Sequence, residues 1–198
     1  MKQLLIITVL LFFSTSLAAI ELRGKFYQGN LILGKAKSQS KVFIDKKKIK
    51  VSDQGFFVFG LAKNRKNDVK IEVINNDLKN VITKKVYKKK YLIQKIDGLP
   101  KKQVTPPKEF YTRIKNDNKL IAKARSVKSD LVFFKDKFAL PLTNSIITGV
   151  YGSQRILNGI PKSPHYGLDF AAKEGTKIKA MLDGLVTLSE KDLYYTGG

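Results

Sequence analysis

Short apolar segments separated by turn-forming residues follow one another from residue 22 to residue 99. The clearest of them, Val69 to Val73, alternates apolar and polar side chains, which is the pattern of a strand with one buried face. The segments are rich in β-branched and aromatic residues, and clusters of Gly, Asn, Asp and Lys separate them. The pattern predicts six strands, at residues 31–33, 41–44, 56–59, 69–74, 81–86 and 91–93. Six short, evenly spaced strands favour a small β-sandwich, with a hairpin turn at Asp53-Gln54-Gly55.

A proline-containing connector follows the predicted sandwich. Pro107 suits the first turn of a helix, with Thr105 or Pro106 near its cap. Beyond it, apolar residues recur at helical spacing, at Phe110, Ile114, Ile121, Ala124 and Leu131. We expect a helix that packs this stripe on a neighbouring part of the protein and exposes Lys115, Lys119 and Lys123.

From Phe138 onward, glycines punctuate the apolar segments. Residues 146–152 predict a strand that ends in glycines, and the loop after it contains Asn158-Gly159. Two more strands are expected after the turns Glu174-Gly175 and Asp183-Gly184, at residues 176–180 and 185–188. The chain is therefore predicted to be mainly β, with a sandwich-like N-terminal module, a helical connector and an antiparallel β domain.

The first residues have the pattern of a targeting segment. Met1 and Lys2 precede an apolar run of about ten residues, and small residues follow it as far as Ala18 and Ala19. This is typical of a secretory signal peptide, cleaved after Ala18 or after Ala19. An uncleaved anchor is the alternative, but the segment turns polar before the roughly 20 apolar residues that span a bilayer. We predict export to the periplasm or cell envelope, with a signal peptide at 1–18, a basic module at 19–99, a linker and helix at 100–137 and a second domain at 138–198.

Positive charge is concentrated in the first two thirds of the chain. The 198-residue protein has a formal net charge of +22, and residues 19–138, with 31 basic and 11 acidic side chains, contribute +20 of it. Such a region favours binding to an anionic cell-envelope polymer or lipid, or it is a solvated lysine-rich surface. Only five of the 38 basic residues are Arg, which together with export argues against nucleic acid as a partner. Cysteine is absent, which excludes disulfides, thiol catalysis and Cys-bearing metal sites.

His165 is the only histidine, and Asp169 follows it by four residues. Imidazole nitrogen and carboxylate oxygen both bind zinc, at about 2.0–2.2 Å. In an extended strand the two Cα atoms would lie roughly 13 Å apart, so the side chains would barely reach one ion. Gly167 between them allows the backbone to bend, and Pro164 helps to fix its approach. By spacing alone, a surface histidine beside a turn and a capping aspartate account for the pair as well.

The residues around this pair carry a family resemblance. They are Val150-Tyr151-Gly152-Ser153-Gln154-Arg155, His165-Tyr166-Gly167-Leu168-Asp169, Glu174-Gly175-Thr176, Ala180, Asp183-Gly184 and Val186. This series resembles the first half of the LytM/lysostaphin-type zinc metallopeptidases, the murein endopeptidases, whose motif is His-x-Gly-x-Asp followed by a Gly-Thr strand, an Ala and an Asp-Gly turn. The resemblance covers about residues 138–198. The connector and sandwich before it resemble the N-terminal extension of some Gram-negative members.

The resemblance implies a zinc-dependent endopeptidase that cuts peptide cross-links of peptidoglycan. It implies a fold of the duplicated hybrid motif type, Zn²⁺ as cofactor, peptidoglycan as partner, and His165 and Asp169 as two of the zinc ligands. No catalytic residue is assigned, because the family's later His-x-His and its further active-site histidine have no counterpart in a sequence with one His. We therefore expect an incomplete peptidase domain, and expect this chain to hold zinc weakly and not to hydrolyse peptidoglycan.

Alternatives stay open at three points. A non-catalytic murein-associated protein on the same fold, such as an amidase activator, is the alternative function. Arg155 is expected either beside the substrate groove or in a structural role. Asn158 is expected either as a turn residue with Gly159 or as a fourth zinc ligand in a latent form.

Overall fold

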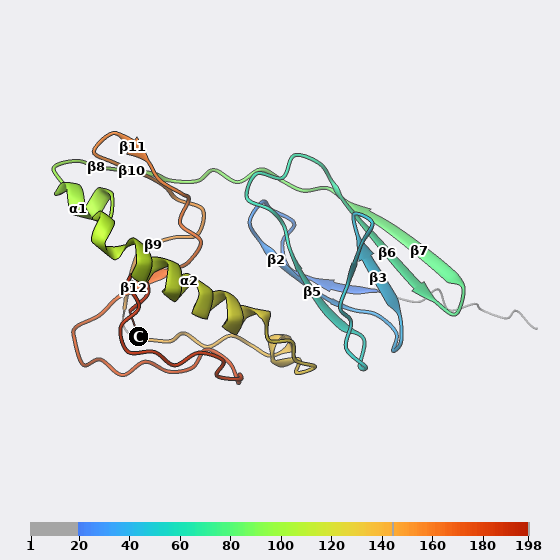
Figure 1. Ribbon diagram of the computed structural model, residues 1–198. Coiled ribbons are helices and arrows are strands. Elements are labelled where there is room, and N and C mark those ends of the chain that lie inside the picture. The colour runs from blue at the N-terminus through green and yellow to red at the C-terminus, as the bar shows by residue number, and fades with distance from the viewer. Residues whose placement is uncertain (1–19, 144, 198) are drawn as a thin grey trace, which may run out of the picture.

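The computed structural model describes residues 20–143 and 145–197. The predicted signal peptide at 1–18 lies outside these residues. The chain is mainly β, with 31% of the residues in strands and 14% in helices, which confirms the predicted fold class. Figure 1 shows most of the strands gathered at the N-terminal end of the chain and the connector with its helix leading away from them.

Two antiparallel sheets make up the N-terminal part, which we call the sandwich. The first sheet has the order β1 (Glu21–Arg23), β2 (Leu31–Lys35), β5 (Phe56–Gly60). The second has the order β4 (Lys47–Ile49), β3 (Lys41–Ile44), β6 (Val69–Asn75), β7 (Leu78–Lys84). Fully buried side chains from both sheets meet in one core, among them Ile32, Val42, Phe57 and Ile71. Burial of this apolar surface holds the two sheets together.

The alternation in β6 has the predicted effect. Val69, Ile71 and Val73 are buried, whereas Lys70 and Glu72 between them face outward. The connection to β7 is a two-residue turn in which Asn76 and Asp77 both have positive φ, 44° and 63°. Such a turn fixes the register of the hairpin. As a result β7 begins at Leu78, and the prediction of a strand at 81–86 is displaced by a few residues.

Two short strands have no counterpart in the prediction. β1 and β4 each comprise three residues, and β4 contains two lysines, so neither segment shows an apolar alternation. Both lie at a sheet edge, where charged residues protect the exposed backbone from pairing with another chain. The strand predicted at 91–93 is also shifted, because β8 spans Ile93–Ile96.

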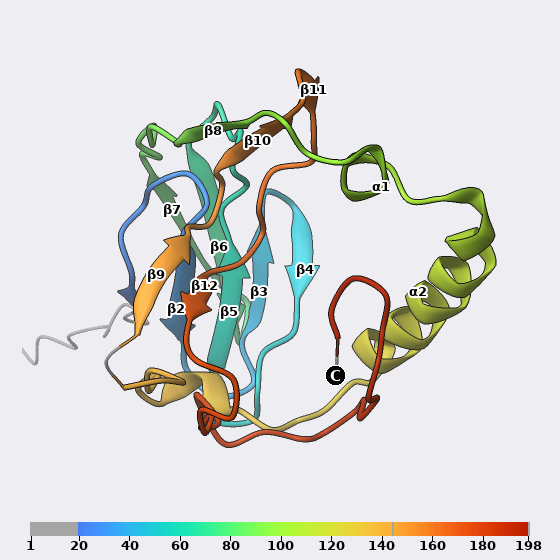
Figure 2. The same cartoon turned by 90° about the vertical axis from the view of Figure 1, so that its left-hand side faces the viewer.

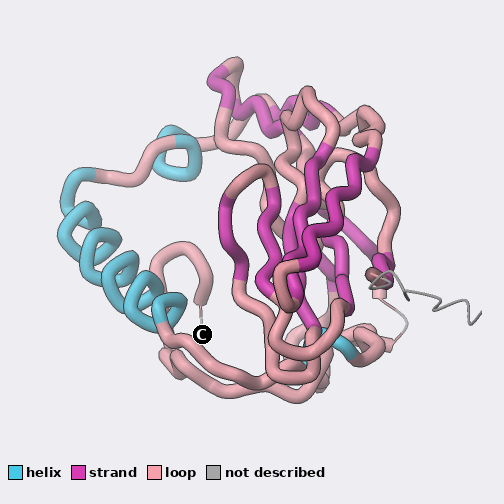
Figure 3. Tube along the Cα trace, turned by 90° about the vertical axis from the view of Figure 1, so that its right-hand side faces the viewer, coloured by secondary structure: helices cyan, strands magenta, loops and turns pink. Residues whose placement is uncertain are grey.

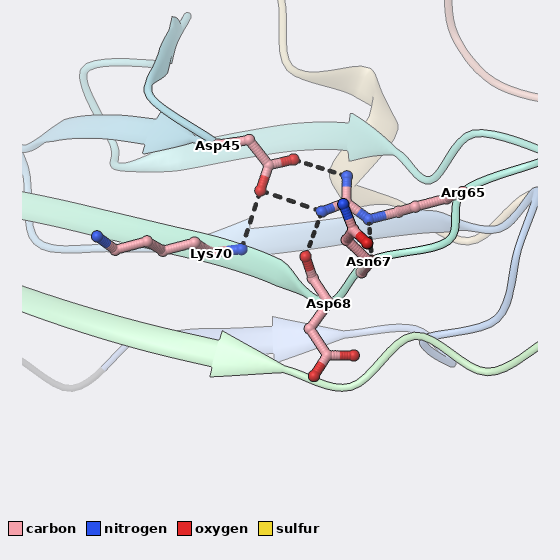
Figure 4. A network of polar contacts seen from close by, with 5 residues as sticks. All are labelled: Asp45, Arg65, Asn67, Asp68 and Lys70. Atoms are coloured by element: carbon pink, nitrogen blue, oxygen red, sulfur yellow. Dashed lines mark hydrogen bonds and ion pairs between the residues drawn. The ribbon is translucent and has the colours of Figure 1, made fainter.

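A polar network closes one end of the sandwich (Figure 4). The guanidinium of Arg65 donates two hydrogen bonds to the Asp45 carboxylate, of 2.6 and 3.0 Å, and others to the carbonyl oxygens of Asn67 and Asp68. The backbone N–H of Lys70 donates to the same carboxylate at 3.0 Å. The hydrogen bonds from Arg65 hold the pKa of Asp45 below its ordinary value. This network ties the loop before β6 to the turn after β3.

The connector leaves the sandwich through β8 and contains one long helix. In order, it holds the one-turn α1 (Lys101–Val104), the 3₁₀ turn η1 (Lys108–Phe110), α2 (Tyr111–Ser126) and the 3₁₀ turn η2 (Phe133–Lys135). α2 stands apart from the strands in Figures 2 and 3, and none of its residues is buried. Lys115, Lys119 and Lys123 are exposed, as expected. The apolar stripe, however, is only half-buried and ends at Ala124, because Leu131 lies beyond the helix.

The C-terminal part contains two small sheets. β9 (Ile146–Gly149) pairs with β12 (Asp169–Ala171), and β10 (Gln154–Leu157) forms a hairpin with β11 (Ile160–Pro161). β10 also pairs in parallel with β8, which joins the connector to this part. The strands predicted at 176–180 and 185–188 are wrong, because both segments are irregular. Around 176–180 the described chain makes only two backbone hydrogen bonds to another segment, from Lys179 to Pro141 and from Ala139 to Met181, and around 185–188 it makes none, which is too few to build a sheet. None of the described helices is long and apolar enough to cross a membrane.

Candidate metal site

The structure brings His165 and Asp169 together. Asp169 opens strand β12, and His165 lies in the loop that leads into it. The distance from Nε2 of His165 to Oδ1 of Asp169 is 3.0 Å, so the four-residue spacing does not keep the side chains apart. The imidazole side chain is 17% exposed and the carboxylate 44% exposed, so the pair is open to solvent on one side.

The room for this pair comes from Gly149, which the sequence did not single out. Gly149 in β9 pairs directly with Asp169, and the register of the two strands shifts just after that position. A Cβ on Gly149 would overlap the carboxylate oxygen of Asp169 and would lie 3.2 Å from Cε1 of His165. Gly167, the expected bend, is less constrained, since a Cβ there would keep an ordinary 3.4 Å from the imidazole. The glycine opposite the aspartate, rather than the glycine between the two ligands, is the one this geometry requires.

A tight turn ahead of β10 holds the histidine in place. The N–H of Gly152 donates to the carbonyl oxygen of His165 at 2.7 Å, and the N–H of His165 donates to that of Ser153 at 2.8 Å. Ser153 is fully buried, and its hydroxyl donates to the carbonyl oxygen of Val150 at 2.8 Å. The Nδ1 atom of His165 lies 3.4 Å from the same carbonyl. This contact orients the ring so that Nε2 is the nitrogen directed at Asp169.

Tyr91 braces that turn from the other side. Its ring packs on Gly152, where a Cβ would overlap the ring. Its hydroxyl donates to the carbonyl oxygen of Gln28 in the sandwich at 2.8 Å. Burial raises the pKa of Tyr91, and the neighbouring Tyr151 raises it further. The His165 turn is thereby connected to the sandwich through one side chain.

Arg155 has a structural contact in the site. Its Nη2 donates to Oδ2 of Asp169 at 3.0 Å, and its Nε lies 3.4 Å from Oε1 of Gln94 in β8. Asp169 therefore uses one carboxylate oxygen toward the imidazole and the other toward the guanidinium. The hydrogen bond from Arg155 fixes the carboxylate plane, as a supporting partner does for a metal ligand.

Asn158 occupies a turn, as one of the two expectations had it. It and Gly159 both have positive φ, 47° and 76°, between β10 and β11. Its amide side chain accepts a hydrogen bond from the N–H of Leu99 at 3.0 Å and donates to the carbonyl of Leu99 at 2.7 Å. Both of its polar atoms are thus engaged with the connector, away from the His165 pair.

The donor set fits part of a zinc site. Two ligands of one tetrahedral zinc, each at about 2.1 Å, lie roughly 3.4 Å apart. The 3.0 Å between Nε2 and Oδ1 is close to that separation. No group of three or more His, Cys, Asp or Glu side chains that could hold a metal occurs among residues 20–143 and 145–197. The described residues therefore supply two of the three protein ligands that a catalytic zinc site uses.

A groove of about 840 Å³ lies beside the pair. His165, Arg155 and Lys162 line it together with the connector residues Thr105 and Pro106. The ammonium group of Lys162 donates to the carbonyl oxygen of Val104 at 2.6 Å, which links the groove to the end of α1. A peptide in this groove would lie next to the imidazole.

Comparison with known proteins adds no relative. No protein-family model matches the chain, and no curated protein matches it either. The functional interpretation therefore depends on the motif and on the geometry of the His165 pair.

Proposed function

We propose that the protein is a LytM-type zinc endopeptidase of the cell envelope that acts on the peptide cross-links of peptidoglycan. The observation that carries the proposal is the convergence of His165 and Asp169, the His-x-Gly-x-Asp residues, to 3.0 Å. An interpretation as a surface histidine with a capping aspartate accounts less well for the arrangement. It leaves unexplained the glycine opposite Asp169 and the buried turn that fixes the imidazole.

Each residue of the site has a definite task under this proposal. His165 and Asp169 would hold the ion, and Arg155 would keep the Asp169 carboxylate in the plane that the ion requires. Zinc, when bound, lowers the pKa of a bound water to about 7 and polarises the scissile carbonyl. The groove beside the pair would hold the substrate peptide.

Zinc binding is tested on residues 19–198 by following the ring signals of the single histidine in NMR spectra during a zinc titration. We expect weak binding, with a Kd above the micromolar range, because two ligands are fewer than a catalytic site uses. The substitutions His165→Ala and Asp169→Ala should each abolish zinc binding, and Asp183→Ala is the matched control. Binding to the His165→Ala variant is measured by calorimetry, because that variant has no histidine ring signal. Zinc binding that neither substitution changes would refute the proposal.

The alternative of a non-catalytic murein-associated protein is favoured by the absence of a third ligand among the described residues. The coding sequence that follows residue 198 separates the two functions. A His-x-His after a further run of strands supports the peptidase, whereas a continuation without it supports the binding protein. For the 198-residue chain we expect no cleavage of purified sacculi under either function.

A further inference from the structure

A row of neighbouring tyrosine side chains extends from the sandwich to the candidate metal site. We call it the tyrosine strip, and its members are Tyr27, Tyr87, Tyr91, Tyr151 and Tyr166. The rings of Tyr27 and Tyr87 lie 5.5 Å apart, and those of Tyr151 and Tyr166 lie 5.9 Å apart. Tyr91 and Tyr151 connect the two pairs, because both approach the same side of Gly29. A Cβ on Gly29 would lie 2.6 Å from the Tyr91 hydroxyl and 2.8 Å from the Tyr151 ring. The last member, Tyr166, is the neighbour of His165.

The backbone of Gln28 holds the first half of the strip in line. Its N–H donates to the carbonyl oxygen of Tyr87 at 2.9 Å, and its own carbonyl accepts the hydroxyl of Tyr91 at 2.8 Å. Its side-chain oxygen accepts the N–H of Lys89 at 3.2 Å. The alignment of these tyrosines is therefore built by hydrogen bonds and does not depend on ring contacts alone.

Lysines accompany the strip along the sandwich. Lys85 lies 5.6 Å from the Tyr87 ring, and Lys63 and Lys89 lie 4.6 and 5.8 Å from the Tyr91 ring. Between Asp77 and Asp97 the sequence has seven lysines and no acidic residue, and among the described residues only Lys79 of these seven forms an ion pair, with Glu72 at 3.1 Å. The Asp68 carboxylate, which accepts the N–H of Val86 at 3.1 Å, offsets one of these positive charges. This part of the surface is therefore strongly positive.

The strip has the chemistry of a binding surface for a sugar polymer with carboxylate groups. The electron-rich face of a tyrosine ring attracts the polarised C–H groups of a sugar, and lysine attracts carboxylates as a point charge. A membrane would engage a flat apolar area, whereas these tyrosines form a single file that ends beside His165. Recognition of nucleic acid favours Arg, whereas the cations that lie over the Tyr87 and Tyr91 rings are all lysines. This difference argues against nucleic acid as the ligand of the strip.

We propose that the tyrosine strip binds a glycan strand of the cell wall and leads its carboxylate-bearing peptides to the groove beside His165. The part of this inference that concerns the groove beside His165 rests on the proposed function. Binding of the glycan to the strip does not require zinc. Tyr87 and Tyr27 are 51% and 41% exposed and Tyr166 is 66% exposed, so both ends of the strip are accessible.

Cosedimentation of residues 19–198 with purified peptidoglycan sacculi, in EDTA, tests the proposal. The triple substitution Lys63→Gln, Lys85→Gln and Lys89→Gln should weaken binding by about tenfold, and Tyr87→Ala by about fivefold. The matched controls lie on α2. The triple substitution Lys115→Gln, Lys119→Gln and Lys123→Gln removes the same charge as the lysine variant of the strip. Tyr111→Ala is the control for Tyr87→Ala, because the two tyrosines are 50% and 51% exposed. The controls should stay within twofold of the unsubstituted chain.

Two other ligands complete the experiment. Vesicles containing anionic lipid and a single-stranded oligonucleotide are offered to the same variants. Equal losses in the strip variants and the α2 controls would show a general charge effect and would overturn the proposal. So would a strip-dependent affinity for vesicles or oligonucleotide that exceeds the affinity for sacculi. The lysine triple variant of the strip should still show the zinc response of the His165 ring signals, so loss of glycan binding and loss of zinc binding remain distinguishable.

Discussion

At the scale of single residues, the site depends on a glycine at a position where any side chain would collide with the His165 pair. Gly149 pairs with Asp169, and its lack of a Cβ leaves space for the carboxylate beside the imidazole. Conformational freedom is not the reason for a glycine here, because Gly149 is not among the residues with positive φ. The requirement is the close approach of two functional side chains to the backbone.

The substitution Gly149→Ala should therefore separate His165 from Asp169. We expect a loss of about 1–3 kcal/mol in the free energy of unfolding from overpacking, and loss of the response of the histidine ring signals to zinc. The measurements are urea unfolding and a zinc titration followed by NMR. Gly184→Ala is the control, since a Cβ at Gly184 meets no atom within 4 Å. An unchanged zinc response in Gly149→Ala would show that the pair does not need this space.

At the scale of elements, a predicted strand was correct where the segment has another strand to pair with, and its local apolar pattern alone was not enough. β2, β3 and β6 are apolar strands with a hydrogen-bonded neighbour on both sides, β5 pairs with β2 on one side, and the prediction located all four. β1 and β4 carry too few apolar residues to be recognised. The segments 176–180 and 185–188 look like strands but have no strand beside them in the described part of the chain. The motif pointed to His165 and Asp169, whereas Gly149 and Tyr91 become part of the site only through contacts between distant segments.

The network of Asp45 and Arg65, which joins a loop to a turn, predicts a specific dependence on pH. Because Arg65 lowers the pKa of Asp45, the ionised carboxylate stabilises the folded state above its ordinary pKa, near pH 4. That contribution is lost as the pH falls through the lowered value. Asp45→Asn should cost about 1 kcal/mol at pH 7, a small value because the carboxylate is 42% exposed and screened by solvent.

Urea unfolding of both proteins from pH 7 to pH 2 measures this effect. The two free energies of unfolding should converge at the acidic end, where the unsubstituted carboxyl also becomes neutral. Asp53→Asn, on an exposed turn outside this network, serves as the control and should be neutral at every pH. A difference that persists unchanged to pH 2 would mean that the hydrogen bonds, and not the charge, stabilise the turn.

At the scale of the whole molecule, the protein is unevenly packed. Among residues 20–143 and 145–197, the cluster of buried apolar residues lies in the sandwich. From residue 171 to residue 181, by contrast, every residue is exposed. Stability should therefore differ between the two parts, since amides in well-packed elements open only with the whole fold.

Hydrogen exchange followed by mass spectrometry should show this gradient directly. We expect the slowest exchange in β3, β5 and β6, and exchange within seconds for residues 180–191, whose N–H groups have no backbone acceptor among the described residues, with β9 and β12 between them. The substitution Ile71→Ala, in the sandwich core, should cost about 2–5 kcal/mol and speed up exchange throughout the sandwich. Val186→Ala, at an 80% exposed position, should change neither. Equal protection in both parts would contradict this view of the packing.

The parallel pairing of β8 with β10 also determines where the protein tolerates extra length. The ladder joins residues 93–96 to residues 154–157, and the whole of α2 lies in the chain between them. Each doubling of such a loop costs only about 0.6 kcal/mol, and α2 has no buried residue that an insertion would displace. The exposed end of the helix, at Val127 and Lys128, is accordingly the place for a fluorescent domain or an affinity tag. A reporter inserted there would leave the contacts on both sides of the ladder in register.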